Sequence, residues 1–312
     1  MSVPARKIVV TGGAGAIGSH LVDRLLAERR GPVVVFDNLS RGRLANLASH
    51  HDEQRLEVIM GDVRDADAVR AAVRGADVVY HLAAQSTVLR GARHPEETFT
   101  TNVVGTFNVL QAAAAAHVHR IVFASSREVY GEPIALPVDE DAPLAAINLY
   151  GASKAAAEAI CRVVQREHAL EIVILRFANV FGPRDFGRVI PCWLERAFAG
   201  HALEIYGGEQ VLDFIWVGHA VDAFARAAAL EAPAPPVNVA SGIGTSLTSL
   251  AQRISCLAGR PGHVRYLPAR PMEVKRFVAN VERMRRLLRI EPPTDPLAEL
   301  PELLGERSPV LA

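Results

Sequence analysis

Cysteine is scarce in this chain: Cys161, Cys192 and Cys256 are the only thiols among 312 residues. Their number is odd, their spacing is wide and no CxxC pair occurs. This pattern argues against a disulfide framework and against a thiolate zinc site. We therefore expect three small, buried hydrophobic side chains in a protein from a reducing compartment, and no metal.

Neither sign of charge is in excess, because 34 Lys and Arg residues balance 34 Asp and Glu residues. A strongly basic field that would attract nucleic acid or an anionic membrane surface is therefore absent. The apolar runs fall short of the roughly 18 residues that a membrane-spanning helix needs. The start of the chain, MSVPARKIVV, has no apolar segment typical of a secretory signal. These absences predict a cytoplasmic location.

Hydrophobic residues make up 50% of the chain and charged residues 22%. This balance is typical of a protein with a sizeable core and excludes a disordered or low-complexity chain. A length of 312 residues allows one large domain or two modest ones.

The first half alternates short β-branched runs with alanine-rich segments of helical periodicity. Most of the runs are continuously apolar, which is typical of parallel strands buried on both faces of a sheet. The expected strands are Lys7–Thr11, Val33–Phe36, Leu56–Met60, Asp77–Leu82, Arg120–Ala124 and Ile172–Arg176. The expected helices are Ile17–Leu26, Asp65–Val73, Asn102–His117 and Ala152–His168. This order predicts an α/β fold with a Rossmann-type doubly wound parallel sheet, which binds ligands at the carboxyl ends of its strands.

The alternation weakens after about Gly182, where prolines and glycines lie closer together. We expect a smaller C-terminal α/β lobe there, although Val237–Ala240 is predicted to return as one more strand. The predicted division is a dinucleotide-binding domain at 1–181 and a mainly substrate-binding lobe at 182–312.

A glycine-rich loop, TGGAGAIG, follows the first expected strand and leads directly into a helix. Of Gly12, Gly15 and Gly18, one permits the tight turn, one lets the backbone approach a pyrophosphate, and one packs helix against strand. The helix N-terminus then supplies N–H donors to the anion. Ordinary tight turns also use glycine, but the strand–loop–helix context favours a dinucleotide site.

Asp37 ends the second expected strand, 19 residues after Gly18. A carboxylate at this place can accept both ribose hydroxyls of an adenosine, which favours NAD over NADP. Arg41 and Arg43 follow closely and could pair with a 2′-phosphate, so NADP is disfavoured but stays open.

Tyr150 and Lys154 are spaced YxxxK at the start of an expected helix. Residues four apart share a helix face, so the phenol and the ammonium can point into one cleft. A phenol with a pKa of about 10 is a poor base at neutral pH, and a neighbouring cation stabilises its phenolate. An exposed, unrelated Tyr and Lys is the alternative, which the position after several strand–helix units disfavours.

These features, with the motifs DNLS (Asp37–Ser40), GDVRD (Gly61–Asp65) and HLAA (His81–Ala84), resemble the extended short-chain dehydrogenase/reductase family. Within it, the chain is similar to the NAD-dependent nucleotide-sugar epimerases and dehydratases, and most of all to UDP-glucose and UDP-glucuronate 4-epimerases. The resemblance runs from about Lys7 to about Leu288. It is specific for the superfamily and less so for the substrate.

The resemblance implies that Ser126 bonds the sugar's 4-hydroxyl, that Tyr150 is the base and that Lys154 is its electrostatic partner. The residues it places at the cofactor are Gly12, Gly15, Ala16, Ile17, Gly18, Asp37, Asn38, Asp62, Val63, Leu82, Ala83, Ala84, Asn102, Tyr150, Lys154 and Phe177. The residues expected at the substrate are Ser86, Thr87, Ser125, Arg127, Glu128, Asn179, Arg188, Tyr206 and Arg270. Asn179 and Arg270 are implied to contact its diphosphate, although Arg270 could also be a solvated loop residue.

Relatives of this kind are expected to start alike, with oxidation of the sugar at C4, and to differ in the fate of the ketone. An epimerase returns the hydride to the other face, whereas a dehydratase or decarboxylase loses a C5 hydrogen or a C6 carboxylate. Glu128 stands where the dehydratase base stands, and UDP-glucuronate decarboxylases keep a glutamate there too. Arg127 stands in the place of the acid, and a guanidinium cannot donate a proton to a leaving hydroxide.

We therefore expect a UDP-hexose 4-epimerase. UDP-glucuronate is a serious substrate candidate, because Arg127 or Arg188 could bind a carboxylate, although each could equally be a surface charge. A dehydratase or UDP-glucuronate decarboxylase that uses Glu128 as base is the alternative. A non-catalytic NAD-sensing regulator is a further one, which the retained Tyr150 and Lys154 disfavour.

One position departs from the family pattern GEQTRDF, because Leu212 replaces the arginine. Arg90 or Lys275 could supply the missing diphosphate contact, and CDP or GDP sugars stay open as substrates. The resemblance also implies a homodimer, formed by the helices at 102–116 and 152–168. The second of these could present one small apolar face made by Ala155, Ala156, Ala159, Ile160 and Val163, unless both helices pack only on their own sheet.

Overall fold

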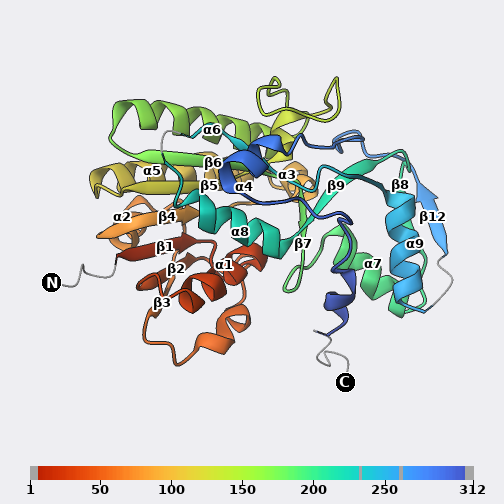
Figure 1. Ribbon diagram of the computed structural model, residues 1–312, viewed down its shortest axis with the longest axis horizontal. Coiled ribbons are helices and arrows are strands. Elements are labelled where there is room, and N and C mark those ends of the chain that lie inside the picture. Colours follow the sequence, from red (N-terminus) through yellow and green to blue (C-terminus); the bar gives the residue numbers. More distant parts are fainter. Residues whose placement is uncertain (1–5, 232–233, 260–262, 306–312) are drawn as a thin grey trace.

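A seven-stranded parallel sheet forms the centre of the larger part of the molecule (Figure 1). The structure is a computed structural model and describes residues 6–231, 234–259 and 263–305. In spatial order the strands are β10 (Val237–Val239), β6 (Glu171–Phe177), β5 (Arg120–Ser126), β4 (Ala76–His81), β1 (Lys7–Thr11), β2 (Val33–Asp37) and β3 (Leu56–Met60). The expected Rossmann-type doubly wound sheet is thus confirmed, with strand ends shifted by one or two residues.

The apolar runs form interior strands because both faces of the sheet are covered. Every residue of β2 is buried, as the continuous run VVVFD predicts. The edge strand β3 differs, since Val58 is 38% exposed and Met60 is 71% exposed. An edge position, with no strand beyond it, explains why this run is not buried on both faces.

Helices cover the sheet on two sides. On one side lie α2 (Ala66–Val73), α5 (Gly105–Ala115) and α6 (Leu149–Glu167), whose inward residues join one apolar cluster. On the other side lie α1 (Ala16–Ala27) and α8 (Val217–Ala227), whose residues join a second cluster. The helix expected at 102–117 begins as the π turn Thr100–Val104 and continues as α5.

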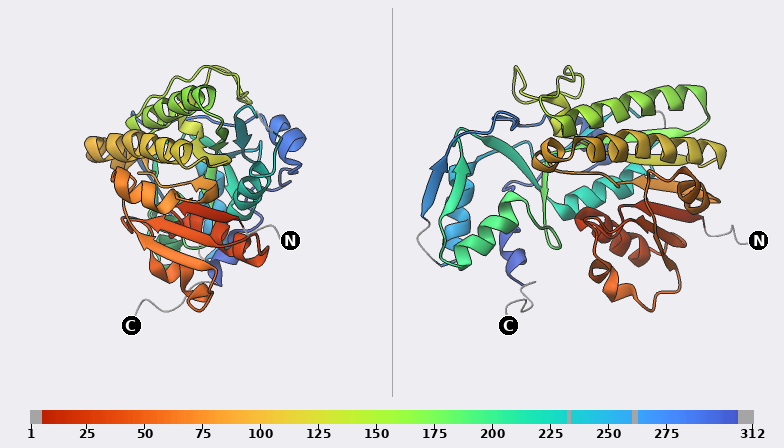
Figure 2. Two further views of the ribbon diagram at one scale, coloured as in Figure 1. Left: turned by 90° about the vertical axis from the view of Figure 1, so that its left-hand side faces the viewer. Right: turned by 180° about the vertical axis from the view of Figure 1, so that it is seen from behind.

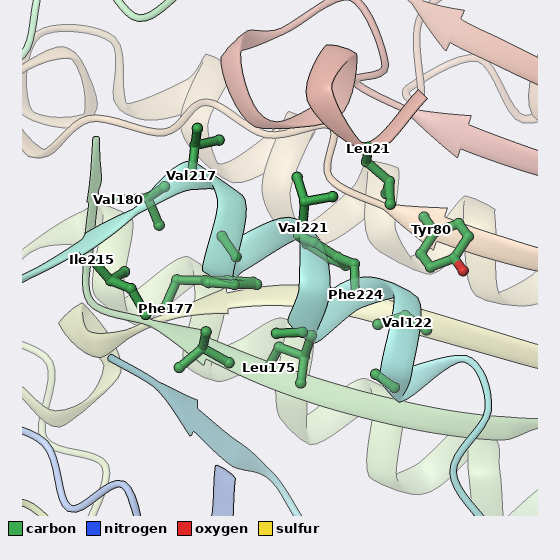
Figure 3. Close-up of a cluster of buried hydrophobic side chains, with 14 of the residues drawn as sticks. Leu21, Tyr80, Val122, Leu175, Phe177, Val180, Ile215, Val217, Val221 and Phe224 are labelled. Carbon is green, nitrogen blue, oxygen red and sulfur yellow. The ribbon is translucent and has the colours of Figure 1, made fainter. Parts of the chain in front are cut away.

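The second cluster is centred on Phe224 of α8 (Figure 3). Its ring meets Phe177 of β6 at a centroid distance of 4.9 Å and the edge of Tyr80 of β4 at 6.2 Å. Leu21 of α1 packs from the same side. The sequence did not predict α8 as part of this core, because α8 lies in the second half of the chain.

A smaller lobe lies at the end of the molecule farther from the N-terminus (Figures 1 and 2). It contains a three-stranded sheet and a two-stranded sheet, with α7 (Val189–Phe198) and α9 (Leu247–Leu257) packed against them. The strands are β7 (Asn179–Phe181), β9 (Val211–Trp216), β11 (Gly244–Ser246), β8 (Leu203–Tyr206) and β12 (Val264–Leu267). Among the helices in the described ranges, none is long and apolar enough to cross a bilayer.

Candidate active site

A cavity of about 670 Å³ lies between the carboxyl edge of the main sheet and the smaller lobe. One wall comes from the loops after β1, β2, β4 and β5 and from the start of α6. The opposite wall comes from the lobe, including β8 and β9. All the residues expected at the cofactor and the substrate line this cavity, except Asp62 and Asn102.

The glycine loop leaves no room for side chains at two of its positions. A Cβ on Gly12, whose φ is +73°, would lie 2.7 Å from the nitrogen of Ala83, and one on Gly18 would lie 2.2 Å from the oxygen of Gly12. Gly15 precedes α1, which has no side-chain cap and no acidic residue in its first turn. The N–H groups at such a helix N-terminus bind anions. This cradle fits the pyrophosphate of a dinucleotide.

Asp37 lies at the end of β2 beside the glycine loop. Its carboxylate accepts the N–H groups of Ala14 at 3.0 Å and Leu39 at 2.8 Å. Burial nonetheless raises its pKa, because only 7% of the residue is exposed. Gly42 lies against the carboxylate, since a Cβ there would be 2.8 Å from both oxygens. A side chain at position 42 would therefore collide with this carboxylate.

Arg41 and Arg43, which could have paired with a 2′-phosphate, both contact Phe186 of the opposite wall. Their guanidinium carbons lie 4.8 and 4.3 Å from the centre of its ring, and Arg41 also donates to its backbone oxygen at 3.0 Å. Such cation–π contacts hold both side chains on the smaller lobe.

Asp62 and Asn102 act behind the wall of the cavity. Asp62 accepts two hydrogen bonds from the Arg64 side chain and one from Asn38 at 2.8 Å, and the Arg64 guanidinium holds its pKa far below the usual range. Asn102 is fully buried and bonds the backbone of Gln85 and the hydroxyl of Ser153. It thereby links the cavity segment after β4 to α6.

The start of α6 positions Tyr150 and Lys154. Asn148 caps this helix, because its Oδ1 accepts the N–H of Gly151 at 2.8 Å. Tyr150 follows in the first turn, and its phenol forms a hydrogen bond with Ser126 at the end of β5. Lys154, one turn later, donates from Nζ to the backbone oxygen of Ala124 at 2.8 Å. The three expected catalytic residues are therefore together at one place in the cavity.

The electrostatics of this cluster set its proton chemistry. Burial lowers the pKa of Lys154 to about 8. Burial raises the pKa of Tyr150, while the bond to Ser126 and the charges of Arg188 and Arg127 oppose this rise. A phenol so placed becomes a base only with cationic help. Arg188 and Arg127 supply such help here, because their charges lower the pKa of Tyr150.

Arg127 and Glu128 form a buried ion pair on the same wall, immediately after Ser126. Arg127 Nη2 lies 2.8 Å from Glu128 Oε1, and both residues are less than 10% exposed. Glu128 Oε2 accepts a hydrogen bond from Asn148 at 2.7 Å. Both oxygens of this carboxylate are therefore occupied, and its contact with Asn148 links it to the first turn of α6.

A second buried ion pair, which sequence reasoning missed, lies behind the catalytic residues. Glu158 of α6 is paired with Arg176 of β6 through bonds of 2.9 and 2.7 Å. Ser125, expected at the substrate, donates its hydroxyl to Glu158 at 2.6 Å. The spacing of Glu158 four residues after Lys154 was the available signal, since both side chains then face the sheet.

The smaller lobe supplies further arginines. Arg270 lies 3.4 Å above the ring of Tyr206 and pairs with Glu273 at 2.8 Å. Arg188 faces the first wall, where its Nη2 donates to the Ser86 hydroxyl at 3.5 Å. Its Nε lies 3.8 Å from Oδ1 of Asp185.

Leu212, which replaces the arginine of the family pattern, lines the cavity and also belongs to the apolar cluster of the smaller lobe. It supplies no charge for a diphosphate. Lys275 does not line the cavity and pairs with exposed Glu209 instead. Arg90 does line it, paired with Glu97. Arg196 of α7 also lines it and was not expected there, because its position in an amphipathic helix resembles that of an ordinary surface charge.

Comparison with known proteins places these features in a family. Residues 8–240 match the NAD dependent epimerase/dehydratase family. A UDP-glucose 4-epimerase from Mycolicibacterium smegmatis is 36% identical over 293 residues, which cover 92% of this chain and 93% of that protein. UDP-glucuronic acid decarboxylase 3 from Arabidopsis thaliana is 31% identical over 299 residues, covering 93% and 85%.

A solved structure is also similar over nearly the whole chain. DesIV, a dTDP-glucose 4,6-dehydratase from Streptomyces venezuelae with NAD bound, has a TM-score of 0.90 and 30% identity, and the match covers 96% of this chain and 97% of that one. The expectation of NAD as the cofactor is confirmed by this likeness and by the family. The chain belongs to the NAD-dependent epimerase/dehydratase family, within the short-chain dehydrogenase/reductase fold.

Proposed function

We propose that this protein is a nucleotide-sugar 4-epimerase that acts on a UDP-hexose. The observation that carries the proposal is the cluster of Ser126, Tyr150 and Lys154 beside a carboxylate, Glu128, whose two oxygens are both engaged. The cluster provides a base for the 4-hydroxyl proton. Because each oxygen of this carboxylate already has a partner, its use as a base for the C5 hydrogen is disfavoured.

Tyr150 takes the proton from the sugar's 4-hydroxyl, and Ser126 holds that oxygen by hydrogen bonding. Lys154 stabilises the phenolate electrostatically, because the two side chains lie one turn apart on α6. NAD, when bound, supplies the acceptor and later the donor of the C4 hydride. Tyr150 then returns its proton to the oxygen as the ketone is reduced on its other face. The backbone cradle at Gly12–Gly18 and the Asp37 carboxylate would hold the dinucleotide.

The nucleotide and the sugar belong to the proposal as well. The M. smegmatis relative is named for UDP-glucose, which supports a UDP-hexose. Arg270, stacked on Tyr206, and the unexpected Arg196 are the lobe residues we assign to the substrate diphosphate, in place of an arginine at 212.

A dehydratase or decarboxylase is the second candidate, favoured by the position of Glu128 in the wall and by the relatives that carry those names. This chemistry requires that Glu128 leave Arg127 or Asn148 and remove a C5 hydrogen, or that a C6 carboxylate depart.

Proton NMR in D2O with UDP-glucose, UDP-glucuronate and UDP-N-acetylglucosamine distinguishes the two candidates. We expect the 4-epimer without deuterium at C5, since 4-epimerisation returns the hydride to C4 and never removes the C5 hydrogen. Deuterium at C5, or loss of water or carbon dioxide, would establish the second candidate. Tyr150→Phe should lower kcat by about 10²–10⁴-fold, and wild-type turnover in this variant would refute the mechanism.

We propose a homodimer formed by α5 and α6, which lie side by side (Figure 2). On α6 the exposed apolar residues follow helical spacing, namely Ala152, Ala156, Ala159 and Val163. Phe107 of α5 is 46% exposed on the neighbouring helix. Ala155 and Ile160, which were expected in the same face, pack against the core clusters instead. A contiguous apolar stripe of this kind is typical of a subunit interface.

A further inference from the structure

Arg127 has a donor with no partner inside the protein. Its side chain is 9% exposed, and its Nη1 is buried without a hydrogen bond to any described residue. A buried guanidinium nitrogen without an acceptor is costly. The same side chain lines the cavity, and its charge acts on the Tyr150 phenol. A ligand oxygen in the part of the cavity next to Ser126 and Tyr150, where the proposed mechanism places the sugar, would satisfy this donor.

The rest of the guanidinium group is held in place. Nη2 contacts Glu128 at 2.8 Å and the Asn179 oxygen at 3.4 Å, and the Phe277 ring lies 5.5 Å below the guanidinium carbon. Glu128 in turn is held by Asn148, which also donates to the Met272 oxygen at 3.2 Å. The direction of Nη1 is therefore fixed before a substrate binds.

The charge of Arg127 is already compensated. Glu128 is its carboxylate partner in a buried pair, so the pair as a whole is neutral. A second carboxylate at Nη1 would place two anions around one buried guanidinium, and the two negative charges would repel each other. Arg188, the other cation beside Tyr150, also faces an acid, Asp185. Arg127 thus offers a directed donor without surplus positive charge.

We propose that Arg127 is a specificity-determining residue whose Nη1 binds an uncharged oxygen of the hexose. Glu128 compensates the charge of Arg127 and thereby disfavours binding of a carboxylate at Nη1. The enzyme would then act on neutral UDP-hexoses and discriminate against UDP-uronates. This inference rests on the proposed function and narrows its substrate class. It also assigns Glu128 a role in selectivity instead of one in proton abstraction.

The test is equilibrium binding of UDP-glucose and UDP-glucuronate to the full-length protein loaded with NAD, measured by calorimetry. We expect the wild type to bind UDP-glucose at least about tenfold more tightly. Glu128→Gln should reduce this preference about tenfold or more, because it leaves the Arg127 charge uncompensated. Glu128→Asp keeps the charge and should keep the preference. Glu132→Gln, which removes an exposed acid outside the cavity, is the matched control and should change neither affinity.

A double variant, Arg127→Met with Glu128→Leu, guards against misfolding of Glu128→Gln, since it leaves no unpaired buried charge. It should bind the two sugars with similar affinity. Equal affinity of the wild type for both sugars, or an unchanged preference in the double variant, would overturn the inference. Normal selective binding without any 4-epimer product would refute the proposed function alone, while failure of both sugars to bind would overturn both.

Discussion

Replacing Glu158 by Gln tests the ion pair that joins the catalytic helix to the sheet. Glu158 is 0% exposed and Arg176 is 3% exposed. The Glu158 carboxylate accepts two bonds from the Arg176 guanidinium and one from the Ser125 hydroxyl. Glutamine retains the shape of the side chain but leaves the buried guanidinium without a counter-charge, so the native state of this variant should be strongly destabilised.

Breaking a buried pair by removing one partner costs about 3–5 kcal/mol of unfolding free energy. An unfolding entropy of about 2.1 cal/mol/K per residue gives about 0.66 kcal/mol/K for the 312 residues. The expected fall in Tm is therefore about 5–8 °C. Differential scanning calorimetry at saturating NAD measures it, because cofactor occupancy is then the same in both proteins.

Glu282→Gln is the matched control. Glu282 is 71% exposed and pairs with Arg285, which is 45% exposed, at 3.1 Å. Losing this surface pair should lower Tm far less than losing the buried pair, because solvent screens exposed charges. Equal effects of the two substitutions would refute the reasoning. Replacing both members of the buried pair, with Glu158→Leu and Arg176→Met, should cost less than Glu158→Gln alone, because no charge is then stranded.

Three further outcomes are expected. Gly18→Val should abolish NAD binding, since even a Cβ there would lie 2.2 Å from the Gly12 oxygen, and NAD retained in the purified variant would contradict this. The kcat for UDP-glucose should fall as the pH rises above about 8, where Lys154 loses the proton that makes it a cation, and a constant kcat there would show that its charge is dispensable. Folding lowers this pKa, so burial of the Lys154 ammonium costs stability at low pH. This cost is relieved as the pH rises from about 8 toward 10.5, and the free energy of unfolding should increase over that range. Val163→Glu should convert the dimer to a monomer in sedimentation experiments, whereas Arg166→Glu on an exposed part of the same helix should not, and a dimer in both would exclude this interface.

The sequence predicted the main sheet well because its strands carry the signal locally. Continuous apolar runs such as VVVFD are typical of strands covered on both faces, so their composition usually reports their burial. The same signal was ambiguous for β3, where the edge position depends on the order of strands in space. The return of α8 to the core was not visible either, since its apolar face would suit either lobe equally well.

The site was predictable where function imposes a fixed spacing. The glycine loop, Asp37 and the YxxxK pair depend on short-range geometry, and all of them line one cavity in the structure. Partners that are distant in the sequence were not predictable. Glu128 was expected at the substrate, but its bond to Asn148 spans 20 residues and depends on how β5 meets α6. The pairing of Glu158 with Arg176, which joins α6 to β6, has the same origin.

The placement of β10 constrains how the chain can be synthesised and divided. β10 pairs with β6, although the chain between them, from residue 178 to residue 236, builds strands and helices that include most of one cavity wall. During synthesis on the ribosome, β6 therefore remains an open sheet edge until Val237–Val239 emerges. Such a long-range pairing slows folding and prolongs exposure of that edge. A fragment that ends after β6 would thus expose an edge prone to aggregation, and separate expression of the two halves would leave each with an incomplete core.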